Sequence, residues 1–264
     1  MLSRASMPSA RADTSRRRFL ARTLAAAAAA LLAGCDAASR SSWFPKVLDL
    51  GERASRRAQR LVTSRRSMAQ EFSAADLSPQ FRSNGTANPD NPQYQALAVN
   101  QFADWRLRID GLVQEPLQLS LKELRAMTSR TQITRHDCVE GWSAIGQWTG
   151  VPLSAVLDKA QPRAQARYVV FHCADPMDAE GTRYYESVDF DDAYHPQTIL
   201  AYALNGAALP VANGAPLRVR IERQLGYKMA KYIMRIELVA SFAHIGAGHG
   251  GYWEDQGYEW YAGI

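Results

Sequence analysis

The chain has 264 residues, of which 47% are hydrophobic and 22% charged, which is enough for one sizeable domain with its own core. Its formal net charge is +5, but residues 1–34 hold six Arg and one Asp, and the remaining 230 residues carry 25 cations and 25 anions. A domain without net charge offers no case for nucleic-acid binding, so we exclude that class of protein.

The N-terminal segment has the features of an export signal. Residues 15–20 (SRRRFL) resemble the twin-arginine motif, and the apolar stretch 24–33 is shorter than the ~20 apolar residues that span a bilayer. Residues 32–35 (LAGC) resemble a bacterial lipobox, in which Cys35 becomes the lipidated first residue, and Asp36 then favours retention at the inner membrane. We predict a periplasmic domain, lipid-anchored to the inner membrane and exported by the twin-arginine pathway. An uncleaved N-terminal anchor is the alternative.

Residues 35–70 are predicted to be a tether followed by a basic helix. Residues 36–45 are small and polar, whereas apolar side chains recur every three or four residues over 46–70 among many arginines. Such a helix lies on anionic lipid beside the anchor, or docks on the domain with a solvated basic face; both remain open. The predicted organisation is a signal at 1–34, this segment at 35–70, and one main domain at 71–264.

The rest of the chain predicts many strands and few, short helices. Residues 71–100 lack periodicity and contain several prolines, so we expect a loop that covers a site. Helices are expected at 121–127, after a capping box that begins at Ser120, and at 152–160. Strands are expected at 105–109, 131–137, 167–173, 217–221 and 233–240. This irregular order predicts an α+β fold with mixed or antiparallel sheets.

Cys138 is the most informative single residue. It follows a predicted strand in a polar setting, and Arg135 and His136 beside it are expected to favour the reactive thiolate. The alternative is a small buried cysteine at a strand end. Cys173 is the second cysteine of the predicted domain. A Cys138–Cys173 disulfide and a metal-bound thiolate exclude each other, and the sequence leaves both open.

A segment further along the chain suits an anion. Gly214 and Gly226 allow the backbone to approach a ligand closely. Arg218, Lys228 and Lys231 supply positive charge, and an arginine can hold a phosphate with two parallel hydrogen bonds. Each cation alone is more often a solvated group on a sheet face. The combination of two glycine loops with three cations predicts a phosphate site.

Together these segments resemble the molybdenum domain of the sulfite oxidase family, in the periplasmic branch that includes the catalytic subunits of methionine sulfoxide reductases. The likeness keeps order and spacing over roughly residues 100–240. The matching segments are Cys138-Val139-Glu140-x-Trp142, Tyr168-Val169-x-Phe171, Ala193-x-His195-Pro196, Asn213-Gly214-Ala215-Pro216-x-Arg218 and Gly226-Tyr227-Lys228-x-x-Lys231.

The resemblance implies a Mo-molybdopterin cofactor and a role for each matching residue. Cys138 is the implied metal ligand, and a soft thiolate suits a redox metal that also binds dithiolene sulfur. From the residues themselves we expect Glu140 to be the proton relay and His136 to lie behind the metal site. The residues implied to hold the cofactor are Asn100, Cys173, Asn213, Arg218, Gly226, Tyr227 and Lys228.

One departure from the family changes the expected substrate. Vertebrate and plant sulfite oxidases carry an arginine five residues after the ligand cysteine, where this chain has Ser143. The carboxylate of Glu140 would repel sulfite, so we expect oxygen-atom transfer on a small neutral substrate. The dimerisation domain of those oxidases has no counterpart here, which predicts a monomeric catalytic subunit. Electrons are expected to pass through a membrane cytochrome b-type or quinone-linked subunit, since no CxxCH motif is present.

Two other classes of function remain open. One is a thiol-redox protein that uses Cys138 and Cys173, and the other is a non-catalytic electron-transfer or binding subunit on the same fold. The tail at 243–264 is rich in glycine and aromatic residues. We expect it to pack on the domain, because aromatic side chains mostly serve burial, with contact to a partner as the alternative.

Overall fold

The computed structural model describes residues 66–264 without a gap, and positions 18, 19, 22, 41, 43, 44, 47, 50, 51, 54, 55, 57, 58 and 64. The chain divides into two compact units, Met1–Val62 and Thr63–Ile264. The apolar stretch at 24–33 and the lipobox at 32–35 lie outside the described residues, as does the export motif apart from positions 18 and 19. The boundaries at residues 34 and 70 therefore stay predictions.

The described positions between 44 and 58 are helical, in agreement with the helix expected over 46–70. The expectation was wrong for the end of that range, because residues 67–70 have no regular structure. A turn lies there instead, in which the Ser67 N–H donates to the Ser64 carbonyl oxygen at 2.9 Å. None of the helices in the described part of the chain is long and apolar enough to cross a membrane.

The first of two sheets is mixed, since β1 and β10 run parallel while its other neighbouring strands are antiparallel. Leu107 and Ile109 alternate with more exposed residues, as predicted for a half-buried strand. In spatial order the strands are β2 (Leu117–Ser120), β1 (Arg106–Gly111), β10 (Ile233–Val239), β5 (Tyr168–Pro176) and β6 (Arg183–Asp189). The strands expected at 105–109, 167–173 and 233–240 are therefore confirmed.

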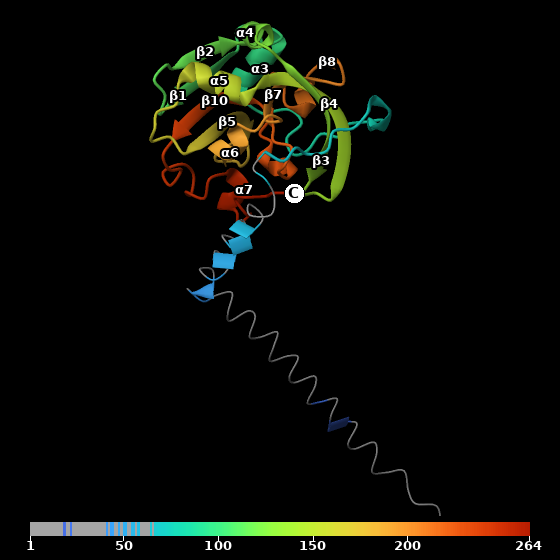
Figure 1. Cartoon of the computed structure of the whole chain (residues 1–264), viewed down its shortest axis with the longest axis vertical. Coiled ribbons are helices and arrows are strands. Elements are labelled where there is room, and N and C mark those ends of the chain that lie inside the picture. Colours follow the sequence, from blue (N-terminus) through green and yellow to red (C-terminus); the bar gives the residue numbers. More distant parts are fainter. Residues whose placement is uncertain are drawn as a thin grey trace, which may run out of the picture. The chain divides into compact units, whose positions relative to one another are not determined.

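The second sheet is antiparallel and is dominated by a long hairpin of β3 and β4, which curves along one side of the domain in Figure 1. The strand expected at 131–137 is confirmed by β3. The one expected at 217–221 is present but shorter, as β9. The members are β3 (Arg130–Cys138), β4 (Trp142–Pro152), β7 (Ile199–Leu204), β8 (Ala207–Ala208) and β9 (Arg218–Arg220), which pairs with β7.

The helices are short and few. Both predicted helices are present, and the Ser120 capping box is formed, since Ser120 Oγ accepts from the Glu123 N–H at 3.1 Å and Glu123 reaches back to the Ser120 N–H at 2.8 Å. Among the described residues of the domain the helical elements are η1 (Ala74–Asp76), α3 (Pro92–Val99), α4 (Leu121–Ala126), α5 (Leu153–Ala160), α6 (Phe190–Ala193), η2 (Val211–Asn213), η3 (Gly226–Lys228) and α7 (Tyr252–Asp255).

The loop expected over 71–100 was wrong in its last third, where α3 forms. The side chain of Asn91 accepts from the N–H groups of Gln93 and Tyr94, and Pro92 occupies the first helical position. Both are strong start signals for a helix. The hydroxyl of the fully buried Tyr94 donates to the Ala215 carbonyl at 2.7 Å, so α3 is held against the loop that precedes β9.

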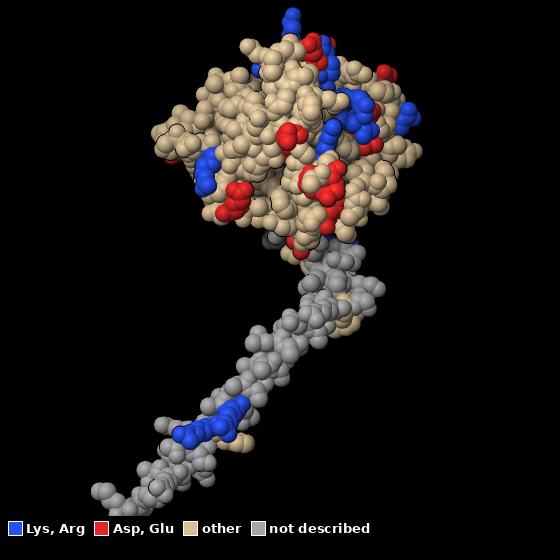
Figure 2. Space-filling model, turned by 180° about the vertical axis from the view of Figure 1, so that it is seen from behind, with Lys and Arg blue, Asp and Glu red and all other residues tan. Residues whose placement is uncertain are grey.

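One continuous hydrophobic core fills the domain. Trp105, Trp148 and Phe171, which come from both sheets or their edges, are fully buried in it. The α+β class with mixed and antiparallel sheets is confirmed. On the face shown in Figure 2, basic and acidic side chains are interspersed and large areas carry neither, in line with the balanced charge of residues 35–264.

Candidate active site

Cys138 is the last residue of β3, and its side chain faces inward. Along β3 every second residue is buried, so Cys138 shares a face with His136 and Thr134. The chain then turns sharply, with the Gly141 N–H donating to the Cys138 carbonyl at 3.0 Å and Gly141 at a φ of 84°. This turn leaves the thiol 8% exposed at the edge of a cavity.

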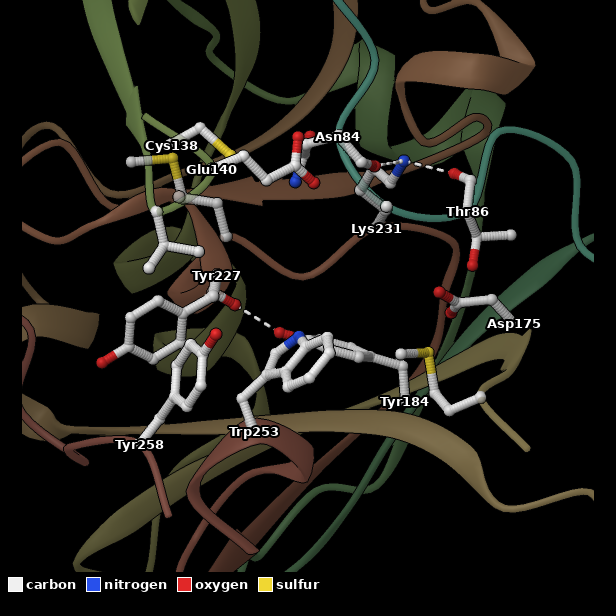
Figure 3. Close-up of a pocket in the computed structure, with 15 residues that line it drawn as sticks. Asn84, Thr86, Cys138, Glu140, Asp175, Tyr184, Tyr227, Lys231, Trp253 and Tyr258 are labelled. Atoms are coloured by element: carbon white, nitrogen blue, oxygen red, sulfur yellow. Dashed lines mark hydrogen bonds between the residues drawn. The ribbon is translucent and has the colours of Figure 1, made fainter. Parts of the chain in front are cut away.

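The cavity holds about 730 Å³ of empty space, the part open to solvent included. Its walls come from segments far apart in the sequence, and Figure 3 shows them around the cavity with Cys138 and Glu140 together on one side. The lining residues are Asn84, Gly85, Thr86, Cys138, Val139, Glu140, Asp175, Met177, Tyr184, Gly226, Tyr227, Met229, Lys231, Trp253 and Tyr258.

The immediate neighbours of Cys138 do not activate its thiol. Burial raises the pKa of Cys138, and the nearby Glu140 carboxylate adds to this, although a backbone hydrogen bond opposes it. The side chain of Arg135 is 55% exposed and pairs with Asp137 at 2.9 Å. The expectation that Arg135 and His136 favour the thiolate was therefore wrong, because one charge is turned away and the other residue is neutral.

His136 is fully buried behind the cavity. Its Nδ1 accepts from Arg220 Nη1 at 2.9 Å, which places the ring proton on Nε2. Burial and the charge of Arg220 hold the pKa of His136 well below its usual value. A Cβ at Gly226 would lie 2.5 Å from the ring, so only glycine lets η3 pack here. His136 thus positions η3 against the end of β3 as a neutral group.

Four cations between residues 218 and 231 are buried, and they fall into two kinds. Arg220 pairs with Glu222 at 2.6 Å, and Lys228 pairs with Glu186 and Glu254 at 2.5 Å each. Arg218 and Lys231 have no carboxylate partner within ion-pair distance among the residues that the structure describes. A charge that is buried without a counter-charge costs free energy. Arg218 and Lys231 therefore suit an anionic ligand, because the protein itself does not supply their counter-charge.

Arg218 is fully buried, and its guanidinium lies 5.0 Å from the centre of the Trp148 ring. It donates from Nη1 to the Asn213 carbonyl at 3.0 Å and more weakly to the Met229 carbonyl at 3.4 Å, while Nε has no partner. Burial, and then repulsion from Arg220, lower the pKa of Arg218 to about 9. This is the chemistry of an arginine that awaits an oxyanion.

Lys231 lines the cavity and is 6% exposed. Its ammonium donates to the carbonyl oxygens of Asn84 and Thr86 at 2.5 Å each and of Ala212 at 3.2 Å. Burial, and then the charge of Arg218, lower the pKa of Lys231 to about 7. The contacts with Asn84 and Thr86 hold the loop at 84–86 against the cavity, and none of the three carbonyl groups neutralises the charge.

Two predicted cofactor-binding residues are not brought to the cavity. Asn100 follows α3 at the surface, where its amide donates to Asp104 at 2.6 Å. Lys228 is turned away from the cavity because Glu186 and Glu254 compensate its charge and raise its pKa against the effect of burial. The placement of Asn100 argues against its predicted role, and the ammonium of Lys228 is not available to a phosphate.

The remaining predicted residues lie at or behind the cavity. Gly226 and Tyr227 line it, and the Tyr227 carbonyl accepts from the hydroxyl of Tyr184. Asn213 is 7% exposed at the end of η2, beside Arg218. Cys173 is buried in β5, where burial raises its pKa well above the usual value. Its thiol is not among the groups that line the cavity.

Glu140 reaches the cavity from the turn after Cys138. Its carboxylate accepts from the Trp142 indole nitrogen at 2.9 Å, which fixes the side chain beside the thiol. Ser143, which stands where some family members have an arginine, donates from Oγ to Asp137 at 2.5 Å. The only anionic group that lines the cavity near Cys138, among the described residues, is therefore Glu140.

Several lining residues were not predicted. The loop at 84–86 was expected to cover a site, but its role in gripping Lys231 was not foreseen. Asp175, which lies just beyond the strand expected at 167–173, is 4% exposed, and burial raises its pKa to about 6. Trp253 and Tyr258 belong to the tail, whose expected packing on the domain is confirmed. The signal for their role was the density of aromatic residues.

Unpaired polar atoms cluster around this cavity and its back wall. Each is buried and has no hydrogen-bond partner: Asn84 Oδ1, His136 Nε2, Asp175 Oδ1, Asn213 Nδ2 and Arg218 Nε. Buried polar groups in folded proteins are almost always paired, so a cluster of exceptions indicates a polar ligand. A soft thiol, two uncompensated cations and unpaired amides fit a sulfur-ligated metal on a pterin with a phosphate.

The disulfide considered for the two cysteines is not formed, because Cys138 and Cys173 are both free. No group of three or more His, Cys, Asp or Glu side chains in the described part of the chain could hold a metal ion.

Comparison with known proteins agrees with the site. The sequence model of the oxidoreductase molybdopterin-binding domain matches residues 94–244. A putative protein-methionine-sulfoxide reductase subunit YedZ1 of Azospira oryzae is 36% identical over 250 residues, 94% of this chain and 87% of that one. The protein-methionine-sulfoxide reductase catalytic subunit MsrP of Xanthomonas axonopodis pv. citri is 40% identical over 154 residues, 55% of this chain and 48% of the relative.

This chain thus spans about half the length of that MsrP relative, and nearly all of the first relative. Among solved structures, the sulfane dehydrogenase SoxCD from Paracoccus pantotrophus matches with a TM-score of 0.47 at 23% identity, over 53% of this chain and 39% of that chain.

Proposed function

Because this chain belongs to the oxidoreductase molybdopterin-binding domain family, we propose that it is the exported catalytic subunit of a methionine sulfoxide reductase. Its class is established: the chain is a molybdopterin-dependent oxidoreductase with a Mo-molybdopterin cofactor, as the resemblance implied. The substrate, the direction of the reaction, the export and the membrane partner are the proposal. The printed names of the relatives support the substrate, since they describe protein-methionine-sulfoxide reductases.

The observation that carries the proposal is that Cys138 lies close to two cations whose charge no carboxylate of the described residues compensates. The thiol lines the same cavity as Lys231, and Arg218 lies behind it with an unpaired Nε. We assign Cys138 as the metal ligand. Burial raises the pKa of this thiol, and coordination to the metal would deprotonate it. Cys138 would therefore hold the metal as a thiolate.

The cofactor is held by groups whose polar atoms await a partner. Arg218 and Asn213 present unpaired N–H donors, and Lys231 adds a positive charge. Gly226 and Tyr227 bring the backbone of η3 to the cavity wall. When bound, the cofactor supplies a metal that accepts oxygen and exchanges two electrons, which the protein side chains themselves do not do.

The reaction needs protons as well as electrons. Reduction of a sulfoxide consumes two electrons and two protons, breaks the S–O bond, and yields a thioether and water. Glu140 is exposed at the cavity and fixed by Trp142, so it can carry protons from solvent to the reacting oxygen. His136 positions η3 without charge. Electrons come from a membrane haem or quinone-linked partner.

The neutral substrate follows from the charges at the cavity. Glu140 is fixed beside Cys138, and the Ser143 hydroxyl is committed to Asp137. The Glu140 carboxylate beside the thiol disfavours an anion such as sulfite, whereas a sulfoxide carries no net charge and has an apolar body. The cavity wall includes Val139, Met177 and Met229, which suits a thioether side chain.

The proposal is tested with a reduced viologen dye as electron donor. We expect the purified holoenzyme to reduce methionine sulfoxide, and Cys138→Ser to lose activity by at least ~10³-fold because the metal loses its protein ligand. We expect Glu140→Gln to keep its cofactor and lose roughly 10²-fold in kcat through slower proton delivery. Reduction of N-oxides or oxyanions with no turnover of sulfoxides would overturn the substrate assignment.

A further inference from the structure

The C-terminal tail, residues 243–264, forms one wall of the cavity, and that wall is aromatic. Trp253 of α7 and Tyr258 after it line the cavity beside Tyr227 of η3. The rings of Trp253 and Tyr258 stack with their centroids 5.3 Å apart, and Tyr258 meets Tyr227 edge to face at 5.3 Å. Figure 3 places this wall across the cavity from Cys138 and Glu140.

Two hydrogen-bond donors of this wall are unused within the described part of the chain. They are the indole Nε1 of Trp253 and the hydroxyl of Tyr258, neither of which makes a side-chain hydrogen bond. Comparable donors nearby are committed. Trp260 Nε1 donates to Ser187 Oγ at 2.8 Å, and the Tyr227 hydroxyl donates to the Glu259 carbonyl at 2.6 Å. Trp253 and Tyr258 both line the cavity, so their unused donors can reach a bound ligand.

The wall is held rigidly from behind. Glu254, next to Trp253 in α7, is 3% exposed and pairs with the buried Lys228, which also pairs with Glu186 of β6. Asp255 accepts from the Tyr185 hydroxyl at 2.5 Å. A group placed by locked neighbours loses little entropy when it binds a ligand, so this anchoring favours recognition by the wall.

Such a wall distinguishes a sulfoxide from the thioether that its reduction produces. The sulfoxide oxygen is a strong hydrogen-bond acceptor, whereas a thioether sulfur is a weak one. The methyl and methylene groups around sulfur pack well on aromatic rings in both cases. Two N–H or O–H donors on an aromatic surface therefore hold the oxidised form more tightly and release the reduced form.

We propose that Trp253 and Tyr258 are specificity-determining residues that donate hydrogen bonds to the sulfoxide oxygen of the substrate while their rings hold its methyl-sulfur end. The inference rests on the proposed function, and it extends the site from Cys138 to the tail. It predicts that the chain recognises a sulfoxide side chain by its oxygen, not by charge.

The test uses variants that keep an aromatic side chain at each position and remove the hydrogen-bond donor. Trp253→Phe and Tyr258→Phe are compared with Tyr252→Phe, a tail residue of the same helix that does not line the cavity. Calorimetry on the oxidised holoenzyme measures the Kd of free methionine sulfoxide and of methionine. We expect each of the first two variants to weaken sulfoxide binding about five- to tenfold, with methionine binding changed less than about twofold, because one hydrogen bond is lost.

The outcomes separate the inference from the function on which it rests. A wild-type enzyme that reduces methionine sulfoxide, with Kd and KM unchanged in both Trp253→Phe and Tyr258→Phe, overturns the inference alone. A wild-type holoenzyme that neither binds nor reduces the sulfoxide overturns the proposed function and the inference with it. An equal loss in Tyr252→Phe would show a general effect on the tail and would also overturn the assignment.

Discussion

Lys228 and Lys231 lie three residues apart on the same segment, and both are buried, yet they are in opposite electrostatic settings. Lys228 contacts two carboxylates and its pKa is raised, whereas Lys231 contacts only carbonyl oxygens and its pKa falls to about 7. Arg220 and Arg218 repeat the contrast two residues apart on β9. Where the fold supplies the counter-charge the cation is structural, and where it does not the cation is kept for a ligand.

The largest effect on stability is expected from the compensated lysine. Lys228→Met leaves Glu186 and Glu254 buried without their cation, which costs about 3–5 kcal/mol of the free energy of unfolding. Denaturant unfolding of the cofactor-free protein measures this loss. Lys159→Met, at an exposed position of α5, is the control and should change stability by less than about 0.5 kcal/mol. Equal losses in the two variants would contradict the structural role that we assign to the buried Lys228 and its two carboxylate partners.

Arg218→Met is expected to separate cofactor binding from folding. The guanidinium hydrogen-bonds only to carbonyl oxygens and lies over the Trp148 ring, and removing its desolvation cost offsets the loss of these contacts, so the cofactor-free protein should change by less than about 2 kcal/mol. Most of the pterin and molybdenum should nevertheless be lost from the purified enzyme. Arg220→Met is the matched control, because it strands Glu222 and should cost about 3–5 kcal/mol. An Arg218→Met protein that retains its full cofactor content would contradict the role of Arg218 in cofactor binding.

Lys231 gives the cofactor-free protein a pH dependence of defined sign. Its pKa is 10.5 ordinarily and about 7 in the fold, so between pH 7 and 8.5 the unfolded state holds a proton that the folded state releases. Stability should therefore rise with pH, by roughly 1 kcal/mol per pH unit. Thermal unfolding at several pH values measures the slope. Lys231→Met should abolish it, and a slope that survives in this variant would assign the effect to other groups.

The smallest effect is expected at Arg135, which the sequence placed beside the thiol. Its side chain is 55% exposed and pairs with Asp137, so Arg135→Ala should change stability by less than about 0.5 kcal/mol. Molybdenum content, measured by mass spectrometry, should stay at the wild-type level. A clear loss of metal would show that this surface charge acts on Cys138 after all.

The elements of the fold could largely be predicted where their pattern is local. The capping box at Ser120 and the alternation of Leu107 and Ile109 depend on neighbours a few residues away, and both are confirmed. The strand β4 was not predicted, because Gly146 and Gly150 interrupt its apolar run. Glycine is required there by residues distant in the sequence, because a Cβ at Gly150 would clash with the backbone of Leu200. The start of α3 could have been predicted from Asn91 and Pro92, which are a typical N-cap and first helical residue.

The site was predictable in its centre and less so around it. The position of Cys138 at the end of β3 followed from the strand pattern, and the cavity forms there. The role of Lys228 depends on carboxylates from Glu186 and Glu254, which are 42 and 26 residues away, so no local pattern reveals that its charge is already compensated. The tail wall depends in the same way on long-range packing.

The most direct test of the account is the metal content and electron paramagnetic resonance spectrum of Cys138→Ser beside the wild-type enzyme. We predict that the wild-type protein carries molybdenum with a spectrum typical of thiolate ligation, and that the variant loses the metal or shows a shifted spectrum, because it lacks the protein's sulfur ligand. A Cys138→Ser protein with full molybdenum and an unchanged spectrum would contradict the assignment of Cys138 and the site built around it.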